Sequence, residues 1–187
     1  MNAQPQCQLD PMFVIADSLE YEEALALLDS LEPVDCDFML GEWRGGEIRT
    51  GHPLEGLLTT SGWDGKSFVD TETVYPLIFK DLKGRRFAGN PARLPLSLVM
   101  KLKLPEADWL KRLFLAFKFL YATKRSGARL RMTDFRGKSS ATMVYDAKPI
   151  QDVFRKVDDE RVIGCMNMKG QDRFYFFWLE RLRPNRA

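Results

Sequence analysis

The sequence is poor in the residues that build metal sites and disulfides. It has one histidine, His52, and three cysteines, Cys7, Cys36 and Cys165, none of them in a C-x-x-C pair. A single imidazole excludes metal clusters and catalytic pairs built on two histidines. An odd number of cysteines without paired spacing predicts neither a disulfide framework nor a zinc site, and is typical of a reducing compartment. We therefore expect no metal.

Motifs of several large enzyme classes are also missing. No G-x-S-x-G is present, so a Ser-His-Asp triad built on His52 lacks a serine on a strand-to-helix turn. No G-x-G-x-x-G or P-loop follows a predicted strand, which argues against a nucleotide cofactor. These absences favour a non-enzymatic protein, although they do not exclude an enzyme.

Signals for export or membrane insertion are missing as well. The first ten residues have neither the basic start nor the apolar run of a signal peptide. No later apolar run approaches the roughly 18 residues that a membrane-spanning helix needs. We therefore expect a cytoplasmic protein. Its 187 residues, 45% of them hydrophobic, predict a single domain, residues 1–187, with one core.

Charge is distributed unevenly along the chain, although the formal net charge is only +2. Residues 1–45 carry ten acidic side chains and one arginine, whereas residues 101–136 carry ten basic side chains and three acidic ones. The asymmetry predicts attraction between these regions, within one fold or across a homodimer interface. Aromatic residues in the basic region have helical spacing, which indicates core packing, and the pI of 8.4 is below that of typical nucleic-acid-binding domains. We expect no nucleic-acid partner.

The start of the chain predicts an amphipathic helix over residues 17–32. Asp17 and Glu20 have the spacing of a capping box, and apolar residues then recur with helical spacing as far as Leu31. The other face of this helix is acidic. We therefore expect one side to pack on the body of the protein and the other to face water.

Short β-rich segments interrupted by glycine begin at Phe38. Residues 66–79 are rich in β-formers, and we interpret them as one strand. A turn at residues 83–85 and a short strand at residues 86–88 follow. We interpret residues 34–92 together as half of a barrel.

A helical insertion is predicted over residues 93–126. Residues 91–105, which lead into it, hold three prolines, and a helix is expected from Pro105 to about Lys124. Leu115 and Phe119 fall near its basic side, so the apolar arc is wider than one packing surface needs. The excess is typical of contact with a ligand, another subunit or an anionic membrane surface.

The last part of the chain, residues 127–184, predicts an antiparallel meander. Residues 150–157 have helical spacing in a short segment, so helix and strand both remain open. Residues 161–168 and 173–182 read as paired strands. Both faces of the last strand are apolar, which predicts that one side lines an interior and that a helix covers the other. An apolar last strand also needs a partner, which favours closure into a barrel.

Two groups of motifs resemble known families. The first group is the sequence Gly-Glu-Trp-Arg-Gly at residues 41–45, with residues 50–53 and 63–68 beyond it. The second group is residues 128–132, 136–137, 140–146 and 149–150. The first group resembles the bacterial GXWXG-domain family, and the second is similar to the domain of unknown function that usually follows it. The glycine-tryptophan motif is also similar to that of lipocalins and nitrobindin-like proteins.

The resemblance implies a mainly β, antiparallel, calycin-like barrel with an N-terminal helix and an inserted amphipathic helix. It implies that Gly41, Trp43 and Gly45 are structural, and that Trp43 plugs the closed end with Arg181 or Arg183 over its ring. Nitrobindin-like proteins draw their haem ligand from the C-terminal half, which has no histidine here. We therefore expect no haem and no other cofactor.

Candidate site residues follow from the strand patterns. Candidate ligand contacts are Arg129, Arg131, Met132, Met143, Phe174 and Phe176. Candidate acid/base residues are His52, Tyr145 and Asp146. Alternation places the two arginines and Met132 on opposite faces of one strand, so they cannot all line the cavity. For His52, a turn histidine bonded within its own loop competes with a pocket-lining role, and Asp146 also fits a turn residue.

Three functional hypotheses follow. The first is a cytoplasmic carrier or sensor that holds a small apolar ligand, such as a fatty acid, inside the barrel. The second is an enzyme that acts on a small apolar substrate in the same cavity through His52 or Asp146, with a haem-binding or assembly module as a further alternative. The third is an interaction protein that uses its acidic and apolar helices for assembly.

Overall fold

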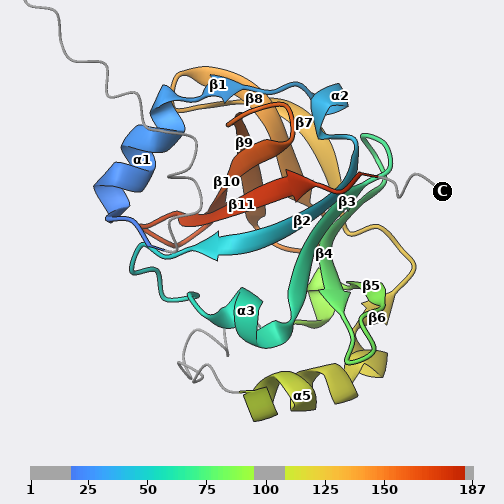
Figure 1. The fold of residues 1–187 in the computed structure, drawn as a ribbon. Helices are drawn as coiled ribbons and strands as arrows, with labels where there is room; N and C mark the ends of the chain where they lie inside the picture. The colour runs from blue at the N-terminus through green and yellow to red at the C-terminus, as the bar shows by residue number, and fades with distance from the viewer. Residues whose placement is uncertain (1–17, 95–107, 184–187) are drawn as a thin grey trace, which may run out of the picture.

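The computed structural model describes residues 18–94 and 108–183. Within them the chain forms one antiparallel sheet in the order β3-β2-β11-β10-β9-β8-β7-β4-β5-β6, with β1 paired to β9 (Figure 1). The strands are β1 (Glu32–Pro33), β2 (Gly41–Ile48), β3 (Trp63–Phe68), β4 (Val74–Lys80), β5 (Arg86–Gly89), β6 (Ala122–Thr123), β7 (Ala128–Phe135), β8 (Lys138–Tyr145), β9 (Ile150–Lys156), β10 (Arg161–Met168) and β11 (Tyr175–Arg181). The helices are α1 (Tyr21–Ser30), α2 (Cys36–Met39), α3 (Leu57–Ser61) and α5 (Asp108–Ala116), with the 3-10 turns η2 (Pro91–Arg93) and η3 (Lys118–Leu120).

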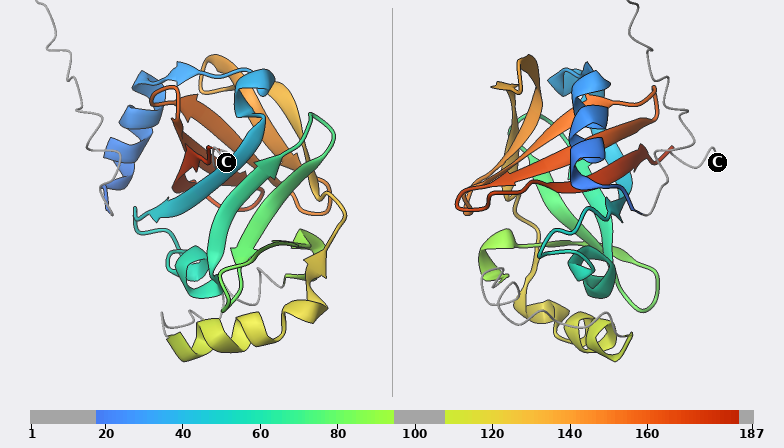
Figure 2. Two further views of the ribbon diagram at one scale, coloured as in Figure 1. Left: turned by 45° about the vertical axis from the view of Figure 1, so that its right-hand side comes forward. Right: turned by 90° about the vertical axis from the view of Figure 1, so that its left-hand side faces the viewer.

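Eight of these strands close into a barrel, because β4 pairs with β3 as well as with β7. The junction between β4 and β7 is a single residue pair, Val74 and Ala128, so the wall is thinnest there. β5 and β6 continue the sheet from β4 outside the ring. The closure confirms the predicted mainly β, antiparallel, calycin-like barrel with an N-terminal helix (Figures 1 and 2).

The predicted N-terminal helix covers the outer face of β10 and β11 (Figure 2). Ala24, Leu27 and Leu28 of α1 are buried against a cluster that includes Ile163 and Phe176 of those strands. This packing explains why the last strand is apolar on both faces, because one face lines the barrel and α1 covers the other.

A capping box starts α1, but one turn later than the sequence predicts. Glu20 accepts the backbone N–H of Glu23, and the Glu23 side chain accepts the N–H of Glu20 (3.1 Å). The predicted cap, Asp17, lies outside the described residues.

The run at residues 66–79 is two strands rather than one. In the turn between β3 and β4, Asp70 accepts the backbone N–H groups of Glu72 (2.8 Å) and Thr73 (2.7 Å). An aspartate that closes its own turn breaks a strand locally. The β-propensity of the whole run conceals such a break.

The predicted meander is confirmed from β7 to β11. The β7–β8 hairpin turns on Arg136 (φ 49°) and Gly137 (φ 79°), a pair of left-handed residues that suits a two-residue loop. Residues 150–157 fall in the strand β9. Asp152 and Arg155 of this strand are charged but buried, at positions where alternation alone would predict apolar side chains. The remaining apolar residues therefore have a helix-like spacing.

The inserted helix is shorter than predicted. α5 ends at Ala116 and is followed by η3 and β6, while Pro105 lies outside the described residues. Leu115 is buried on the side toward α3, whereas several apolar side chains of this region are exposed: Trp109, Leu113, Phe117, Phe119 and Leu120. Among the residues described, no helix has the length and apolar character needed to cross a membrane.

Candidate ligand-binding site

Two side chains of β3, Trp63 and Lys66, both point into the barrel. A regular strand would place them on opposite faces. The register of β3 against β4 shifts on both sides of Gly65. Gly65 has φ +141°, and a Cβ there would lie 2.0 Å from the Trp43 carbonyl oxygen. A bulge of this kind re-aims side chains, so both Trp63 and Lys66 line one cavity.

The cavity has a volume of about 110 Å³, and residues of α3, α5 and η2 contribute to its lining. α3 and α5 lie at one end of the barrel (Figure 1). Most of its lining is apolar: Leu54, Leu57, Leu58, Leu77, Phe79, Pro91, Leu94, Phe114, Ile150, Met166 and Phe177. The polar members are Ser61, Trp63, Lys66, Tyr145, Asp152 and Tyr175. An apolar cavity with a few convergent polar groups is the usual construction of a small-molecule site.

Lys66 and Asp152 form a buried ion pair at this cavity. The Lys66 Nζ lies 2.8 Å from Asp152 Oδ2, with side-chain exposures of 3% and 2%. The same nitrogen donates to the Pro76 carbonyl (3.2 Å). It also lies 4.8 Å from the ring centre of Phe177 and 5.9 Å from that of Tyr145, distances at which a cation interacts with a ring.

Burial of the ion pair shifts pKa values around it and leaves polar atoms beside it without a hydrogen-bond partner. Burial raises the pKa of Asp152, and the Lys66 charge opposes that rise. Burial, and then the charge of Asp152, raises the pKa of the Tyr145 hydroxyl. Asp152 Oδ1 and Trp63 Nε1 are both buried without a hydrogen-bond partner in the described part of the chain. Because unpaired buried polar atoms are costly, these two atoms are candidates for contact with a ligand.

His52 does not line the cavity. Its Nδ1 accepts the backbone N–H of Leu54 (3.1 Å), and its ring packs edge-on against Tyr175 at 5.3 Å between centres. Burial lowers the His52 pKa, and a contact with the Arg173 backbone partly opposes this. The structure thus confirms a turn histidine that is hydrogen-bonded within its own loop.

Tyr145 and Asp146 do not form an acid/base pair. Tyr145 lines the cavity, but Asp146 follows it on the outer surface, because consecutive strand residues point to opposite faces. Asp146 pairs there with Arg129 (2.7 Å), and Arg131 pairs with Glu72 (2.7 Å). Neither arginine therefore lines this cavity, and the expected contact of Arg129 or Arg131 with a ligand stays a prediction that the observed geometry does not support.

The two candidate methionines also lie away from the cavity lining. Met143 is fully buried in the barrel core but is not in contact with the cavity. Met132 is 48% exposed, although it shares a face with buried Leu130. Beyond Ala128, β7 pairs only with β8, so Met132 lies where the strand has left the closed part of the wall.

The side chains of Phe174 and Phe176 lie in the cluster outside the barrel, under α1, and do not line the cavity. Phe176 packs under α1, with its ring centre 6.1 Å from that of Tyr21, and Phe174 belongs to the same outer cluster. Their neighbours Tyr175 and Phe177 line the cavity instead. Because both faces of β11 are apolar, the sequence offered no polar residue to set which face points inward.

The glycine-tryptophan motif packs against α2, where Trp43 lies beside Phe38. Trp43 is fully buried, and its Nε1 donates to the Met39 carbonyl (2.8 Å). The guanidinium carbon of Arg181 lies 4.3 Å from the Trp43 ring centre, which confirms the predicted pairing. Gly41 has φ +122°, and a Cβ at Gly45 would lie 2.4 Å from the Trp63 ring, so both glycines are structural.

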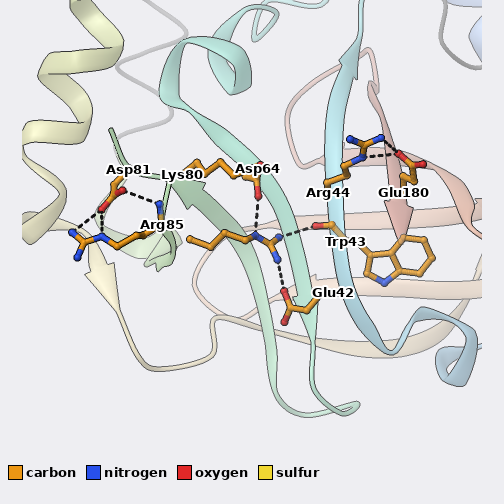
Figure 3. A network of polar contacts seen from close by, with 9 residues as sticks. Glu42, Trp43, Arg44, Asp64, Lys80, Asp81, Arg85 and Glu180 are labelled. Carbon is orange, nitrogen blue, oxygen red and sulfur yellow. Dashed lines mark hydrogen bonds and ion pairs between the residues drawn. The ribbon is translucent and has the colours of Figure 1, made fainter. Parts of the chain in front are cut away.

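A polar network on the outer surface holds the β3 bulge. The guanidinium of Arg86 on β5 contacts the carboxylates of Glu42 (2.7 Å) and Asp64 (2.8 Å). It also donates to the Trp43 carbonyl (3.0 Å), which faces Gly65. Figure 3 shows Glu42, Asp64 and Trp43 around this network. By joining β5 to β2 and β3, Arg86 supports the irregular backbone that directs Lys66 inward.

Sequence reasoning missed Lys66, Asp152 and Trp63 as site residues. The available signal was weak, because Lys66 and Asp152 lie in strands that also hold the polar residues Asp64, Ser67 and Gln151, although a charge is rarely buried without a partner. The bulge at Gly65 concealed it, since strict alternation separates Trp63 from Lys66.

Comparison with known families matched residues 26–84 to the GXWXG protein family and residues 126–181 to a domain of unknown function, DUF4334. A crystal structure of a protein from Thermomonospora curvata is similar, with 32% sequence identity and a TM-score of 0.69 over 92% of this chain and 95% of that one. The chain belongs to the GXWXG family. Comparison with curated proteins returned no match. In this GXWXG protein the motif tryptophan is buried beside α2, and the candidate ligand contacts come from other strands.

Proposed function

We propose that this GXWXG protein binds a small, neutral, apolar ligand inside its barrel. The observation that carries the proposal is the apolar cavity beside Lys66 and Asp152, in which Asp152 Oδ1 has no partner in the described residues. A ligand group that donates a hydrogen bond would satisfy that oxygen. The free thiols Cys36 and Cys165 support placing this binding in the cytoplasm.

Charge balance favours a neutral ligand. Lys66 and Asp152 neutralise each other, and Arg129 and Arg131 are engaged on the outer surface. A ligand carboxylate inside the cavity would add an uncompensated negative charge next to Asp152, which is expensive in a buried site. A fatty acid would therefore place only its apolar part in the cavity.

The volume favours a ligand of modest size. About 110 Å³ is open inside the cavity. A cavity of roughly 150 Å³ lined by apolar side chains holds a benzene molecule. The cavity described above is somewhat smaller, so a single ring that moves the lining side chains slightly outward, or the end of an acyl chain, is the size class that it supports.

The geometry gives less support to the enzymatic and haem alternatives. His52 lies outside the cavity lining and Asp146 lies on the outer surface, so neither reaches a substrate in the cavity. Among the described residues, no group of three or more His, Cys, Asp or Glu could hold a metal ion. Binding therefore accounts for the cavity better than acid/base chemistry by these two residues.

A thermal-shift series with three probes of similar size and different charge tests the proposal. Benzyl alcohol should raise the melting temperature in a dose-dependent way, because a ligand that binds only the folded state stabilises it. Benzoate and benzylamine at the same concentration should not. Met166→Trp, or Leu77→Trp from another strand, fills the cavity and should abolish the effect, whereas Met132→Trp on the outside should not. Equal shifts with all three probes, or none with benzyl alcohol, would contradict it.

Native mass spectrometry of protein purified from cells provides a second test. Wild-type protein should carry a co-purified neutral molecule, and the cavity-filling Met166→Trp protein should not. The same adduct on both proteins would show that it binds elsewhere.

The exposed apolar face of α5 and η3 favours a second candidate function, docking at an anionic lipid surface. Trp109 is 63% exposed, Phe119 69% and Leu120 57%, and Arg112 lies exposed on the same helix. Interfacial helices combine aromatic and basic residues in this way.

Sedimentation with vesicles tests this docking. Wild-type protein should pellet with vesicles containing phosphatidylserine but not with pure phosphatidylcholine, and Trp109→Ser/Phe119→Ser should stay in solution. Leu82→Ser, at another exposed apolar site, is the matched control. Dimer formation in size-exclusion chromatography, lost in the double variant, would instead assign this face to a homodimer.

A further inference from the structure

The surroundings of the Lys66 side chain resemble those of a nucleophilic lysine. It lines the apolar cavity and is almost fully buried. Its ammonium has one charged partner, Asp152, at 2.8 Å and one neutral partner, the Pro76 carbonyl, at 3.2 Å. An ammonium has three N–H donors, and these two hydrogen bonds use two of them.

The ion pair is difficult to explain by stability alone. Removing two charges from water costs several kcal/mol for each ion, and well-packed apolar residues often replace buried pairs without loss. The surrounding cavity is apolar, so such a replacement would suit its packing. A chemical role for the pair accounts for its presence.

We propose that Lys66 captures an apolar aldehyde or ketone in the cavity as an iminium, with Asp152 as its proton relay and counter-ion. This inference rests on the binding proposed above and names the class of ligand. A lysine in an apolar pocket is the usual nucleophile for a carbonyl group.

The protons and bonds balance without an additional reactant. The Lys66 ammonium passes one proton to Asp152, and the neutral amine attacks the carbonyl carbon. The C–N bond forms as the carbonyl π bond breaks, and one amine proton moves to the oxygen, which gives a carbinolamine. Protonated Asp152 returns its proton to that hydroxyl, which leaves as water as the C=N bond forms. The products are an iminium cation, the Asp152 carboxylate and one water.

The residues around Lys66 stabilise both the ammonium before the reaction and the iminium after it. Ammonium and iminium carry the same single charge, so Asp152 neutralises each in turn. The faces of Phe177, Trp63 and Tyr145 lie within 4.8, 5.5 and 5.9 Å of the nitrogen, and aromatic faces stabilise cations at these distances. Carbon substituents on the nitrogen would extend into the apolar space rather than into water.

Reductive trapping with benzaldehyde tests the inference. Wild-type protein is incubated with benzaldehyde and cyanoborohydride, digested and mapped by mass spectrometry. We expect a benzyl group on Lys66 at least about tenfold above that on Lys169, an exposed lysine, because the cavity concentrates the aldehyde beside the amine. Excess benzyl alcohol should suppress labelling of Lys66 only. Because the map uses wild-type protein, it does not depend on whether a variant folds.

Variants separate the roles of the two residues. Lys66→Arg keeps a cation beside Asp152 but cannot form an iminium, so the cavity adduct should disappear. Asp152→Asn removes the relay and counter-ion and should reduce labelling of Lys66 to the level of Lys169. Lys169→Arg should leave the labelling of Lys66 unchanged.

The outcomes also separate this inference from the proposed function. If benzyl alcohol stabilises the protein but Lys66 is labelled no faster than Lys169, the carbonyl inference is overturned and the binding proposal stands. If neither benzyl alcohol nor benzaldehyde affects the protein, both are overturned. Preferential labelling of Lys66 that benzyl alcohol suppresses supports both.

Discussion

The guanidinium of Arg181 lies over the ring of Trp43, with 4.3 Å between the guanidinium carbon and the ring centre. The same guanidinium donates to the carbonyls of Leu40 (2.7 Å) and Phe38 (2.5 Å), the residues around the end of α2. Arg181 thus joins the last strand of the barrel to the segment that leads into β2. The last strand is thus fastened beside the motif tryptophan to the segment that precedes it.

Trp43→Ala should lower the free energy of unfolding by about 4 kcal/mol, because it opens a large void in a fully buried position. Arg181→Met should cost less, about 2 kcal/mol, from the ring contact and the lost hydrogen bonds. Urea denaturation of both variants measures these changes. An unchanged transition for Trp43→Ala would show that the ring does not plug the barrel.

The two residues of the buried ion pair should be strongly coupled. Lys66→Met leaves Asp152 without its cation, and Asp152→Leu leaves the ammonium without its anion, so each should cost about 4 kcal/mol. The double variant should recover to within about 1 kcal/mol of wild type, since no buried charge is left unpaired. A double-mutant cycle in urea measures the coupling, and additive losses would contradict a direct pair.

His52 should make stability depend on pH below about 6.5. Burial lowers its pKa below the unfolded value of 6.5, so the unfolded chain binds more protons in this range. The contribution of neutral His52 is complete above pH 6.5 and is lost as the pH falls toward the folded pKa. His52→Asn keeps an acceptor for the Leu54 N–H but does not titrate.

We therefore expect a shallower pH dependence for His52→Asn than for wild type over that range, measured as unfolding free energy in urea. The lowered pKa of Asp29, caused first by its bond to Arg136, acts only below about pH 4 and is shared by both proteins. Parallel curves for the two proteins would show that His52 is not responsible.

The two glycines after Arg44 should differ in their tolerance of alanine. A Cβ at Gly45 would lie 2.4 Å from the Trp63 ring and 2.8 Å from Leu179, both buried, so Gly45→Ala should cost about 2 kcal/mol and weaken benzyl alcohol binding. A Cβ at Gly46 meets the ring of Trp178, which is partly exposed and can move outward. Gly46→Ala should therefore cost less and leave binding unchanged, as denaturation and thermal-shift measurements will show.

Sequence reasoning predicted the architecture well because its signals are local. Glycine at the turn between Lys83 and Arg85, the apolar last strand and the glycine-tryptophan motif each specify backbone geometry without knowledge of distant residues. The pairing of Arg181 with Trp43 followed from the family resemblance, and the structure confirms it.

The site was harder to predict because it depends on which face of each strand points inward. Phe176 was assigned to the cavity and Phe177 lines it, a shift of one residue that a strand apolar on both faces cannot reveal. The pair of Lys66 and Asp152 joins strands separated by 86 positions in the chain, and a bulge alters the alternation on one of them. Neither fact is visible in a local pattern.

Calorimetric titration of benzyl alcohol into the wild-type protein and into Met166→Trp tests the binding proposal most directly. Wild type should show saturable binding of one molecule per chain with a negative heat-capacity change, because apolar surface leaves water. Met166→Trp, which fills the cavity from β10, should show no saturable heat while keeping a cooperative unfolding transition. Equal binding to both proteins, or no saturable binding to wild type, would contradict a ligand site inside the barrel.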